Sequence, residues 1–301
     1  MGEDQKSGIP RQKPPWLTRR LPTGPAYENL KTLLTARRVH TVCQQARCPN
    51  IWECFAQGTA TFLILGSQCT RGCRFCAVGR GPTEPPDPEE PARVAEAAAT
   101  MGLTYVVVTS VSRDDLPDGG AAYFARTITE IRRRLPNALV EVLVSDFCGD
   151  PDALRAVAAA RPDVLNHNLE TVDRLYPVVR PQADYRRSLA LLGHAKRYSP
   201  GLPTKSGLML GLGETVAEVE EALRDLAQVS CTMLTLGQYL QPTREHLPVA
   251  RFLSPEEFTT WRRKALDMGF SQVASGPFVR SSYHAKELYQ AAEFWPAPRR
   301  S

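Results

Sequence analysis

Long hydrophobic runs are absent from this 301-residue chain. A membrane-spanning helix needs about 20 consecutive apolar residues, and no stretch comes near that length. The opening MGEDQKSGIPRQKPPW also lacks the apolar core of a secretory signal peptide. We therefore expect a soluble, cytoplasmic protein with no membrane partner.

Signatures of nucleic-acid binding are missing as well. The net charge is +5, and basic residues gather near the start at Arg11, Lys13, Arg19 and Arg20. Such a charge would suit an acidic partner, but the interleaved aromatic and basic residues typical of RNA-binding modules do not occur. We interpret the charge as ordinary surface variation and expect no nucleic-acid partner.

Histidine is scarce, whereas cysteine is not. Of five histidines, His167 and His284 stand beside motifs of interest, but they lack metal-ligand neighbours, so we expect them to form hydrogen bonds. Most of the eight cysteines crowd into residues 43–76. Because cytoplasmic thiols stay reduced, this crowding indicates metal binding or catalysis rather than disulfides. Cys148 and Cys231 lie outside the crowded segment and are expected to be packing residues.

Composition and periodicity divide the chain into three parts. An N-terminal extension, 1–58, begins with a Pro-rich, charged arm over about residues 1–25, which we expect to lie over the main body or to be partly disordered. It continues with a helix over 26–40. Residues 59–250 alternate strands and helices, and 251–301 form a C-terminal extension. Strands are expected at 60–66, 104–111, 139–146, 163–170, 206–213 and 231–240.

Helix start signals support this alternation. Thr215 with Glu218, and Ser254 with Glu257, have the spacing of capping boxes, and Pro255 occupies the favoured first helical position. About six strand-helix units joined by crossovers predict an α/β fold with a parallel sheet. Periodicity alone leaves open a doubly wound sheet or an incomplete barrel. In both, the active site lies at the carboxyl ends of the strands.

The loop CTRGCRFC follows the first strand directly and places Cys69, Cys73 and Cys76 at spacings of four and three. A structural zinc ion usually takes four closed ligands, whereas this loop offers three. A 4Fe-4S cluster held by three thiolates keeps one iron open for a substrate or cofactor. Zinc binding and simple electron transfer remain the alternative interpretations.

The spacing CxxxCxxC, with Phe75 before the last cysteine, resembles the signature of radical S-adenosylmethionine (SAM) enzymes. This resemblance implies a partial (β/α)6 TIM-type barrel of the radical SAM kind. It also implies a 4Fe-4S cluster on Cys69, Cys73 and Cys76 whose open iron binds SAM. One electron from this cluster cleaves SAM and produces a 5′-deoxyadenosyl radical.

Further residues are assigned to SAM binding by the same resemblance. SGLMLGLGET resembles the strand that flanks the adenine, where glycines such as Gly211 permit close approach. Without the family, turn formation is the simpler interpretation of these glycines. Asn168 and Glu170 end a strand, where they suit ribose hydroxyls or the methionine amino group. Arg180 suits the methionine carboxylate, although a lone arginine is usually a solvated charge.

A second cysteine group, Cys43, Cys48 and Cys54, resembles the auxiliary-cluster motif CxxxxCxxxxxC of the lipoyl synthase family, and the likeness extends over about residues 25–290. The resemblance implies a second 4Fe-4S cluster whose fourth iron is bound by Ser282 of the RSSY motif. Taken alone, the serines of this motif favour a helix N-cap.

The implied activity is radical insertion of two sulfur atoms, at C6 and C8, into a protein-bound octanoyl group, with the auxiliary cluster consumed as the sulfur source. The implied partners are octanoylated lipoyl-carrier domains (2-oxoacid dehydrogenase E2 or glycine cleavage H protein), a ferredoxin- or flavodoxin-type electron donor and an iron-sulfur carrier for cluster repair. Alternatives are another radical sulfur-inserting enzyme, such as biotin synthase or a methylthiotransferase, a non-catalytic iron-sulfur electron carrier, or a zinc-stabilised binding module.

Overall fold

The computed structural model describes residues 13–18 and 25–293. Within these ranges a central eight-stranded sheet has the order β1-β2-β5-β6-β7-β8-β9-β10. Strand β1 is antiparallel to β2, and every other pairing in this sheet is parallel. The bounds are β1 His40–Thr41, β2 Thr61–Ile64, β5 Tyr105–Ser110, β6 Leu139–Leu143, β7 Val164–Asn166, β8 Thr204–Leu210, β9 Met233–Gln238 and β10 Gln272–Gly276.

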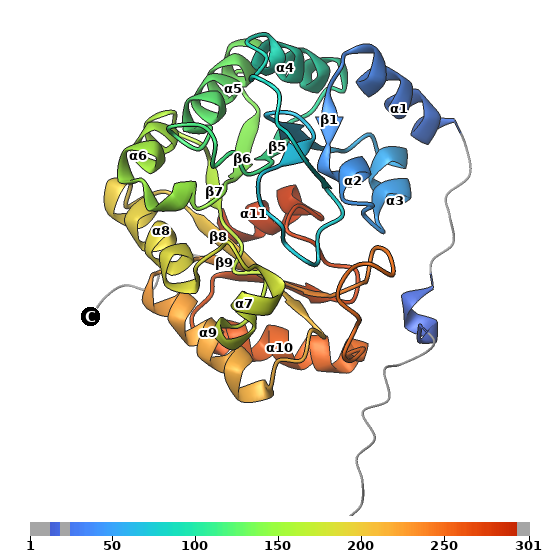
Figure 1. Cartoon of the computed structure of the whole chain (residues 1–301), viewed down its shortest axis with the longest axis vertical. Helices are drawn as coiled ribbons and strands as arrows, with labels where there is room; N and C mark the ends of the chain where they lie inside the picture. Colours follow the sequence, from blue (N-terminus) through green and yellow to red (C-terminus); the bar gives the residue numbers. More distant parts are fainter. Residues whose placement is uncertain (1–12, 19–24, 294–301) are drawn as a thin grey trace, which may run out of the picture.

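The strand order distinguishes the two architectures that periodicity left open. A doubly wound sheet reverses its strand order at a switch point. Here the parallel strands follow one another in chain order from β2 to β10, and β1 and β10 remain as edges. The expected partial barrel is therefore confirmed, and Figure 1 shows its strands enclosed by helices.

The outer helices are α4 (Glu90–Thr100), α5 (Ala121–Arg134), α6 (Pro151–Ala159), α8 (Tyr185–Tyr198), α9 (Val216–Gln228) and α10 (Pro255–Asp267). Helices α9 and α10 begin with the capping boxes that the sequence predicts, Thr215 with Glu218 and Ser254 with Glu257. Each box pairs two backbone N–H groups that the first helical turn would leave unsatisfied.

Several elements differ from expectation. The predicted helix 26–40 ends at Ala36, and the predicted strands 206–213 and 139–146 are observed as Thr204–Leu210 and Leu139–Leu143. Strand β10 was not predicted, because QVASG is short and has only Val273 buried. Strand β7 ends at Asn166 rather than at residue 170, although Glu170 forms an isolated bridge to Leu208 of β8. The last helix, α11 (Ala285–Glu293), begins after the RSSY motif rather than within it.

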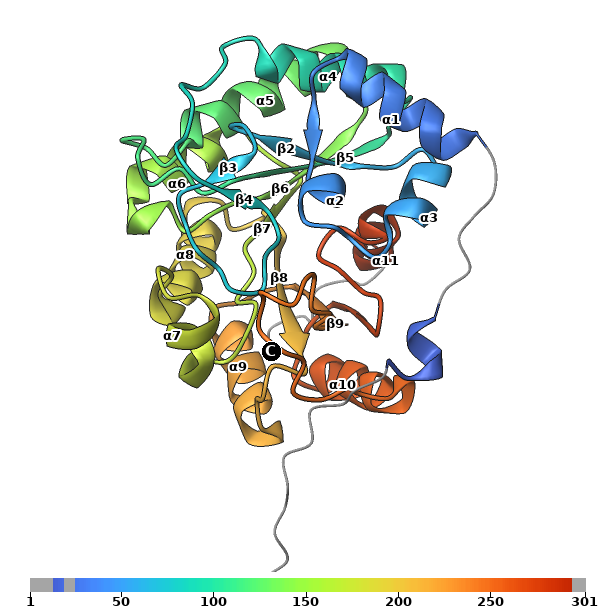
Figure 2. The same ribbon diagram turned by 45° about the vertical axis from the view of Figure 1, so that its right-hand side comes forward.

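The N-terminal extension lies along the β2 edge of the barrel. Helices α1 (Ala26–Ala36), α2 (Val42–Gln45) and α3 (Ile51–Ala56) gather there, as Figure 2 shows. Tyr27 of α1 stacks on Trp52 of α3 with ring centroids 4.0 Å apart. Most of the predicted arm lies outside the described residues, but Trp16 within it donates a hydrogen bond to the Leu253 carbonyl (3.2 Å).

The interior of the barrel contains a buried polar layer. Glu141 of β6 accepts hydrogen bonds from Tyr105 (2.7 Å) and Asn166 (3.0 Å), and its carboxylate pairs with Lys205 of β8 (2.9 Å). Next to this layer, Tyr289 of α11 packs against Tyr105.

No helix in the described ranges combines the length and the apolar character that crossing a bilayer requires.

Candidate active site: two cysteine triads

The CxxxCxxC loop begins where β2 ends. Leu65 (φ 68°) takes a left-handed conformation there, and its N–H donates to the buried Glu90 carboxylate (2.7 Å). Cys69 ends the short strand β3 (Gln68–Cys69), which pairs with β4 (Gly79–Arg80) and closes the base of the loop. The N–H groups of Arg71 and Ser112 donate to the Cys69 sulfur at 3.4 and 3.3 Å. The first thiol is thus positioned by backbone groups from two loops.

An ion-pair network centred on Arg71 fixes the position of the CxxxCxxC loop. The buried Arg71 guanidinium binds Asp114 through two hydrogen bonds (2.7 and 2.9 Å) and Asp146 through a third (2.5 Å). Cys148 is not the packing residue that the sequence suggested, because it is exposed and its thiol donates to Asp114 (3.3 Å). Its left-handed backbone (φ 52°) turns it away from the core. Cys231 is buried as expected.

Two further residues hold this loop and were not singled out from the sequence. Gln182 donates to the Thr70 carbonyl (3.3 Å), and the His246 Nε2 bonds the Cys76 carbonyl (3.0 Å). A carbonyl only accepts hydrogen bonds, so His246 donates through Nε2. Both residues lie in loops far along the chain, and no local pattern marks them.

Arg180 lies beside the loop. Its Nη1 donates to the carbonyls of Asn168 (2.9 Å) and Leu169 (3.1 Å) and to the Tyr176 hydroxyl (3.2 Å). Burial raises the pKa of Cys73, and the neighbouring Arg180 charge opposes this rise. Among the described residues, no hydrogen-bond acceptor meets the buried Arg180 Nε. The guanidinium is therefore held through Nη1, and its Nε can still donate to a ligand.

Asn168 and Glu170 lie just beyond the carboxyl end of β7, which stops at Asn166, rather than within the strand that the sequence predicts. Asn168 Nδ2 donates to Glu170 Oε1 (2.9 Å), whereas its buried Oδ1 has no partner among the described residues. Burial raises the pKa of Glu170, and the charge of Arg180 opposes this effect. Phe75 packs against the hydrophobic core. The structure alone requires a glycine at position 211, because its φ is 101° and a Cβ there would collide with the Arg251 carbonyl.

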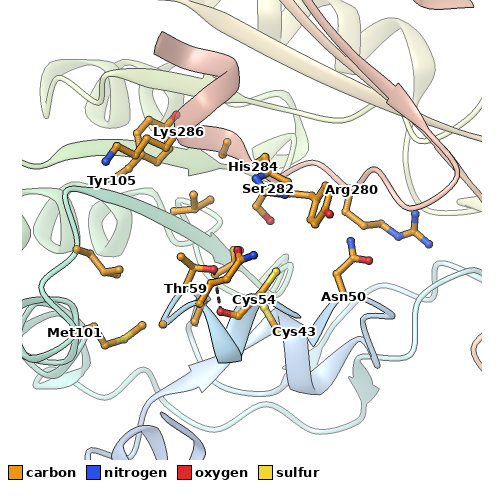
Figure 3. A pocket seen from close by; sticks show the side chains of 18 of the residues that line it. Cys43, Asn50, Cys54, Thr59, Met101, Tyr105, Arg280, Ser282, His284 and Lys286 are labelled. Carbon is orange, nitrogen blue, oxygen red and sulfur yellow. Dashed lines mark hydrogen bonds between the residues drawn. The ribbon is translucent and has the colours of Figure 1, made fainter. Parts of the chain in front are cut away.

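The second triad comes together from two short helices and the turn between them. Cys43 lies in α2, Cys48 in the turn and Cys54 in α3. All three line a cavity of about 310 Å³, which Ser282 and Arg280 also line. In Figure 3 Ser282 points into the cavity opposite Cys43 and Cys54. Burial raises the pKa of Cys43 to about 12, and the Cys48 thiol adds to the rise.

Long-range hydrogen bonds hold the RSSY segment over this cavity. The Tyr283 hydroxyl donates to Glu53 of α3 (2.9 Å), and Ser281 accepts a bond from Asn168 (2.5 Å). Because α11 begins at Ala285, Ser282 lies three residues before the helix and not at its N-cap. The simple capping interpretation of Ser282 is therefore wrong.

The two cysteine triads differ from the ligand sets of single metal ions. In the described part of the chain, no three His, Cys, Asp or Glu side chains converge on one point as ligands of a single metal ion. In a 4Fe-4S cluster each thiolate binds its own iron, so its ligands stand farther apart. The cavity lined by the second triad and the spare polar atoms beside Cys73 offer donors of the kind that an iron-sulfur cluster and a polar cofactor would use.

Comparison with known proteins first defines the class. Residues 63–226 match the family model of the radical SAM superfamily. Methylornithine synthase superimposes with a TM-score of 0.56 over 85% of this chain and 75% of its own, at 15% identity. The hydrogenase maturase HydG gives 0.53 over 88% and 67%, at 14% identity. Fold and cysteine loop together define a radical SAM enzyme.

Relatives of higher identity define the family. Residues 3–48 match the N-terminal domain of lipoyl synthase. Lipoyl synthase of Desulfotalea psychrophila is 55% identical over 281 residues, 93% of this chain and 94% of its own length. The Nitrosococcus oceani protein is 58% identical over 276 residues (91% and 85%), and that of Thermus thermophilus 54% over 286 (94% and 88%). This chain belongs to the lipoyl synthase family.

Proposed function

We propose that this chain inserts sulfur into an octanoyl group by dividing the work between its two cysteine triads. As a member of its family it uses SAM and a 4Fe-4S cluster, and it acts on octanoylated carrier proteins. The positions to be sulfurated, C6 and C8, carry C–H bonds that no side-chain acid or base can break. Bound cofactors supply the radical that attacks these bonds and the sulfur that replaces the hydrogen.

Cys69, Cys73 and Cys76 hold the first cluster in this proposal, and the rim beside them receives SAM. Arg180 directs its spare Nε toward the SAM carboxylate, as a preorganised guanidinium does. Glu170, already held by Asn168 (2.9 Å), accepts from the amino group or a ribose hydroxyl. Support comes from buried polar atoms that lack partners among the described residues next to Cys73.

Cys43, Cys48 and Cys54 hold a second cluster, with Ser282 as its oxygen ligand. The observation that carries this assignment is the shared cavity, which joins thiols of the N-terminal extension (1–58) to a hydroxyl of the C-terminal extension (251–301). A hard oxygen ligand matches a cluster iron less well than a thiolate does. Ser282 is therefore the ligand suited to release first when sulfur is withdrawn.

The same cavity offers a path for the acyl chain. Ala60, Met101, Leu103 and Val107 contribute apolar atoms to its lining, to which the exposed Lys286 also contributes. An octanoyl chain on a lysine of a carrier domain suits such a wall. We propose 2-oxoacid dehydrogenase E2 domains or the glycine cleavage H protein as carriers.

Three further elements complete the proposal. A ferredoxin- or flavodoxin-type protein supplies electrons, and an iron-sulfur carrier rebuilds the second cluster after turnover. Six thiols kept as ligands require a reducing compartment, so we place the reaction in the cytoplasm. The segment 59–250, which forms the barrel together with α10 and β10, serves radical formation, while the residues before and after the barrel serve sulfur supply.

The test compares two triple alanine variants in anaerobically reconstituted protein. Wild type should hold about eight irons per chain, and each variant about four. Replacing Cys69, Cys73 and Cys76 should abolish SAM cleavage. Replacing Cys43, Cys48 and Cys54 should leave reductive formation of 5′-deoxyadenosine intact and eliminate lipoyl product. Lipoyl formation by the second variant would exclude this triad as the sulfur site.

A matched pair tests the serine ligand. Ser282→Ala should lose lipoyl product and retain SAM cleavage, whereas Ser282→Cys, which keeps a ligand atom, should retain the iron of the second site. Near-normal sulfur insertion by folded Ser282→Ala would contradict the ligand role.

A further inference from the structure

One side chain joins the rim of the first site to the serine turn of the second. Asn168 uses its Nδ2 group twice, donating to Glu170 Oε1 (2.9 Å) and to Ser281 Oγ (2.5 Å). Ser281 is the chain neighbour of Ser282, which points into the cavity of the second triad. The amide therefore lies between a SAM-site carboxylate and the segment that delivers the serine.

The backbone around this amide is rigid. Glu170 has a left-handed φ of 67°, which is costly for a non-glycine residue and persists only where neighbours enforce it. Its N–H donates to the Gly207 carbonyl (2.9 Å), and its carbonyl accepts from Met209 N–H (2.9 Å). Strand β8 thus holds the backbone of Glu170 in place. A ligand that displaces the Glu170 carboxylate therefore moves the neighbouring side chains, because the backbone cannot shift with it.

A second interaction, between Glu170 and Arg280, also links the first site to the turn that carries Ser282. The charge of Arg280, which directly precedes Ser281, opposes the rise that burial causes in the pKa of Glu170. Arg280 also lines the cavity of the second triad. Glu170 therefore senses Arg280 through its charge and Ser281 through the shared Asn168 amide, at two successive positions of the turn that carries Ser282.

We propose that Asn168 is a positioning residue that couples SAM binding at the first site to the placement of Ser282 at the second. The inference rests on the proposed function. Both N–H groups of the amide are engaged, so a ligand that draws Glu170 or the spare Oδ1 toward itself must change the bond to Ser281. Coupling between sites is reciprocal, so a ligated Ser282 must change SAM affinity by the same factor.

A thermodynamic cycle tests this coupling without turnover. The SAM dissociation constant is measured calorimetrically on oxidised, cluster-loaded protein, with and without the second cluster, the latter being the Cys43→Ala, Cys48→Ala, Cys54→Ala variant. With Ser281 present, loss of the second cluster should change the constant by about fivefold or more. In the Ser281→Ala background the same loss should change it by less than about twofold, because the link is already broken.

Two controls keep the test specific. Ser281→Thr retains a hydroxyl that can accept the bond from Asn168, so it should keep the coupling. Coupling in Ser281→Thr together with its loss in Ser281→Ala assigns the loss to the missing hydroxyl. Ser275→Ala removes a hydroxyl that donates to the Phe258 carbonyl (2.8 Å), away from this link, and should leave the coupling unchanged. As a second readout, SAM should perturb the electron paramagnetic resonance signal of the reduced second cluster in wild type but not in Ser281→Ala.

The outcomes separate the coupling from the function beneath it. Equal changes in the SAM dissociation constant in the Ser281 and Ser281→Ala backgrounds would overturn the coupling, while intact SAM cleavage and lipoyl formation would leave the proposed function standing. A wild-type protein that binds no SAM would overturn the function and the coupling together.

Discussion

Gly237 allows the C-terminal extension to reach the second cysteine triad. It lies in β9, paired with Gly276 of β10, and the backbone of Val279 passes directly over it. A Cβ at Gly237 would lie well inside 3.0 Å of the Val279 carbonyl oxygen, 3.1 Å from its carbonyl carbon and 3.2 Å from the Arg280 guanidinium. A backbone carbonyl cannot rotate away as a side chain does. Gly237→Ala must therefore displace the segment that ends in Ser282.

The magnitude follows from this geometry. Overpacking a tight site costs about 1–3 kcal/mol, which a barrel of this size should survive folded. A shift of about 1 Å in the position of a reacting group lowers the rate on the order of 100-fold. We expect Gly237→Ala to keep SAM cleavage near the wild-type rate and to form at least about tenfold less lipoyl product per 5′-deoxyadenosine. Chromatography of both products under anaerobic single-turnover conditions measures the ratio.

Gly276→Ala is the matched control, because a Cβ there would meet only the Val279 Cγ2 atom, at an ordinary 3.5 Å. It should keep the wild-type product ratio. The reasoning is refuted if Gly237→Ala retains that ratio in a folded protein, or if both variants lose product equally.

Two further predictions concern stability, each measured by anaerobic urea unfolding. Lys205→Met leaves the buried Glu141 carboxylate without its cation, whose Nζ lies 2.9 Å away in the wild type, and should lower the free energy of unfolding by about 3–5 kcal/mol. Adding Glu141→Gln removes the unpaired charge and should recover part of this loss. No recovery would contradict the pairing argument. Burial lowers the pKa of His167 from 6.5 to about 4, so between these values the unfolded chain binds the extra proton and acid favours unfolding. The wild type should lose about 2 kcal/mol more than His167→Gln between pH 7 and pH 5, and equal losses would show that His167 does not control this range.

The sequence alone determined the features that depend on neighbours close in the chain. The spacings of Cys69, Cys73 and Cys76 predicted the first cluster loop, because all three cysteines lie in one short segment of the chain. The capping boxes at Thr215 and Ser254 located two helix starts, since a cap involves residues three positions apart. Regular alternation of strands and helices indicated a parallel sheet, but it did not distinguish a barrel from a doubly wound sheet.

Tertiary structure decided what depends on distant segments meeting. Ser282 faces Cys43 and Cys54 only because contacts such as Tyr283 with Glu53, 230 residues apart, fold the two extensions over one barrel edge. No local pattern encodes such an approach, because closing a loop of that length draws its energy from the assembled core rather than from either segment. The same reason explains why the support from His246, the exposure of Cys148 and the bond from Asn168 to Ser281 emerged only from the folded chain.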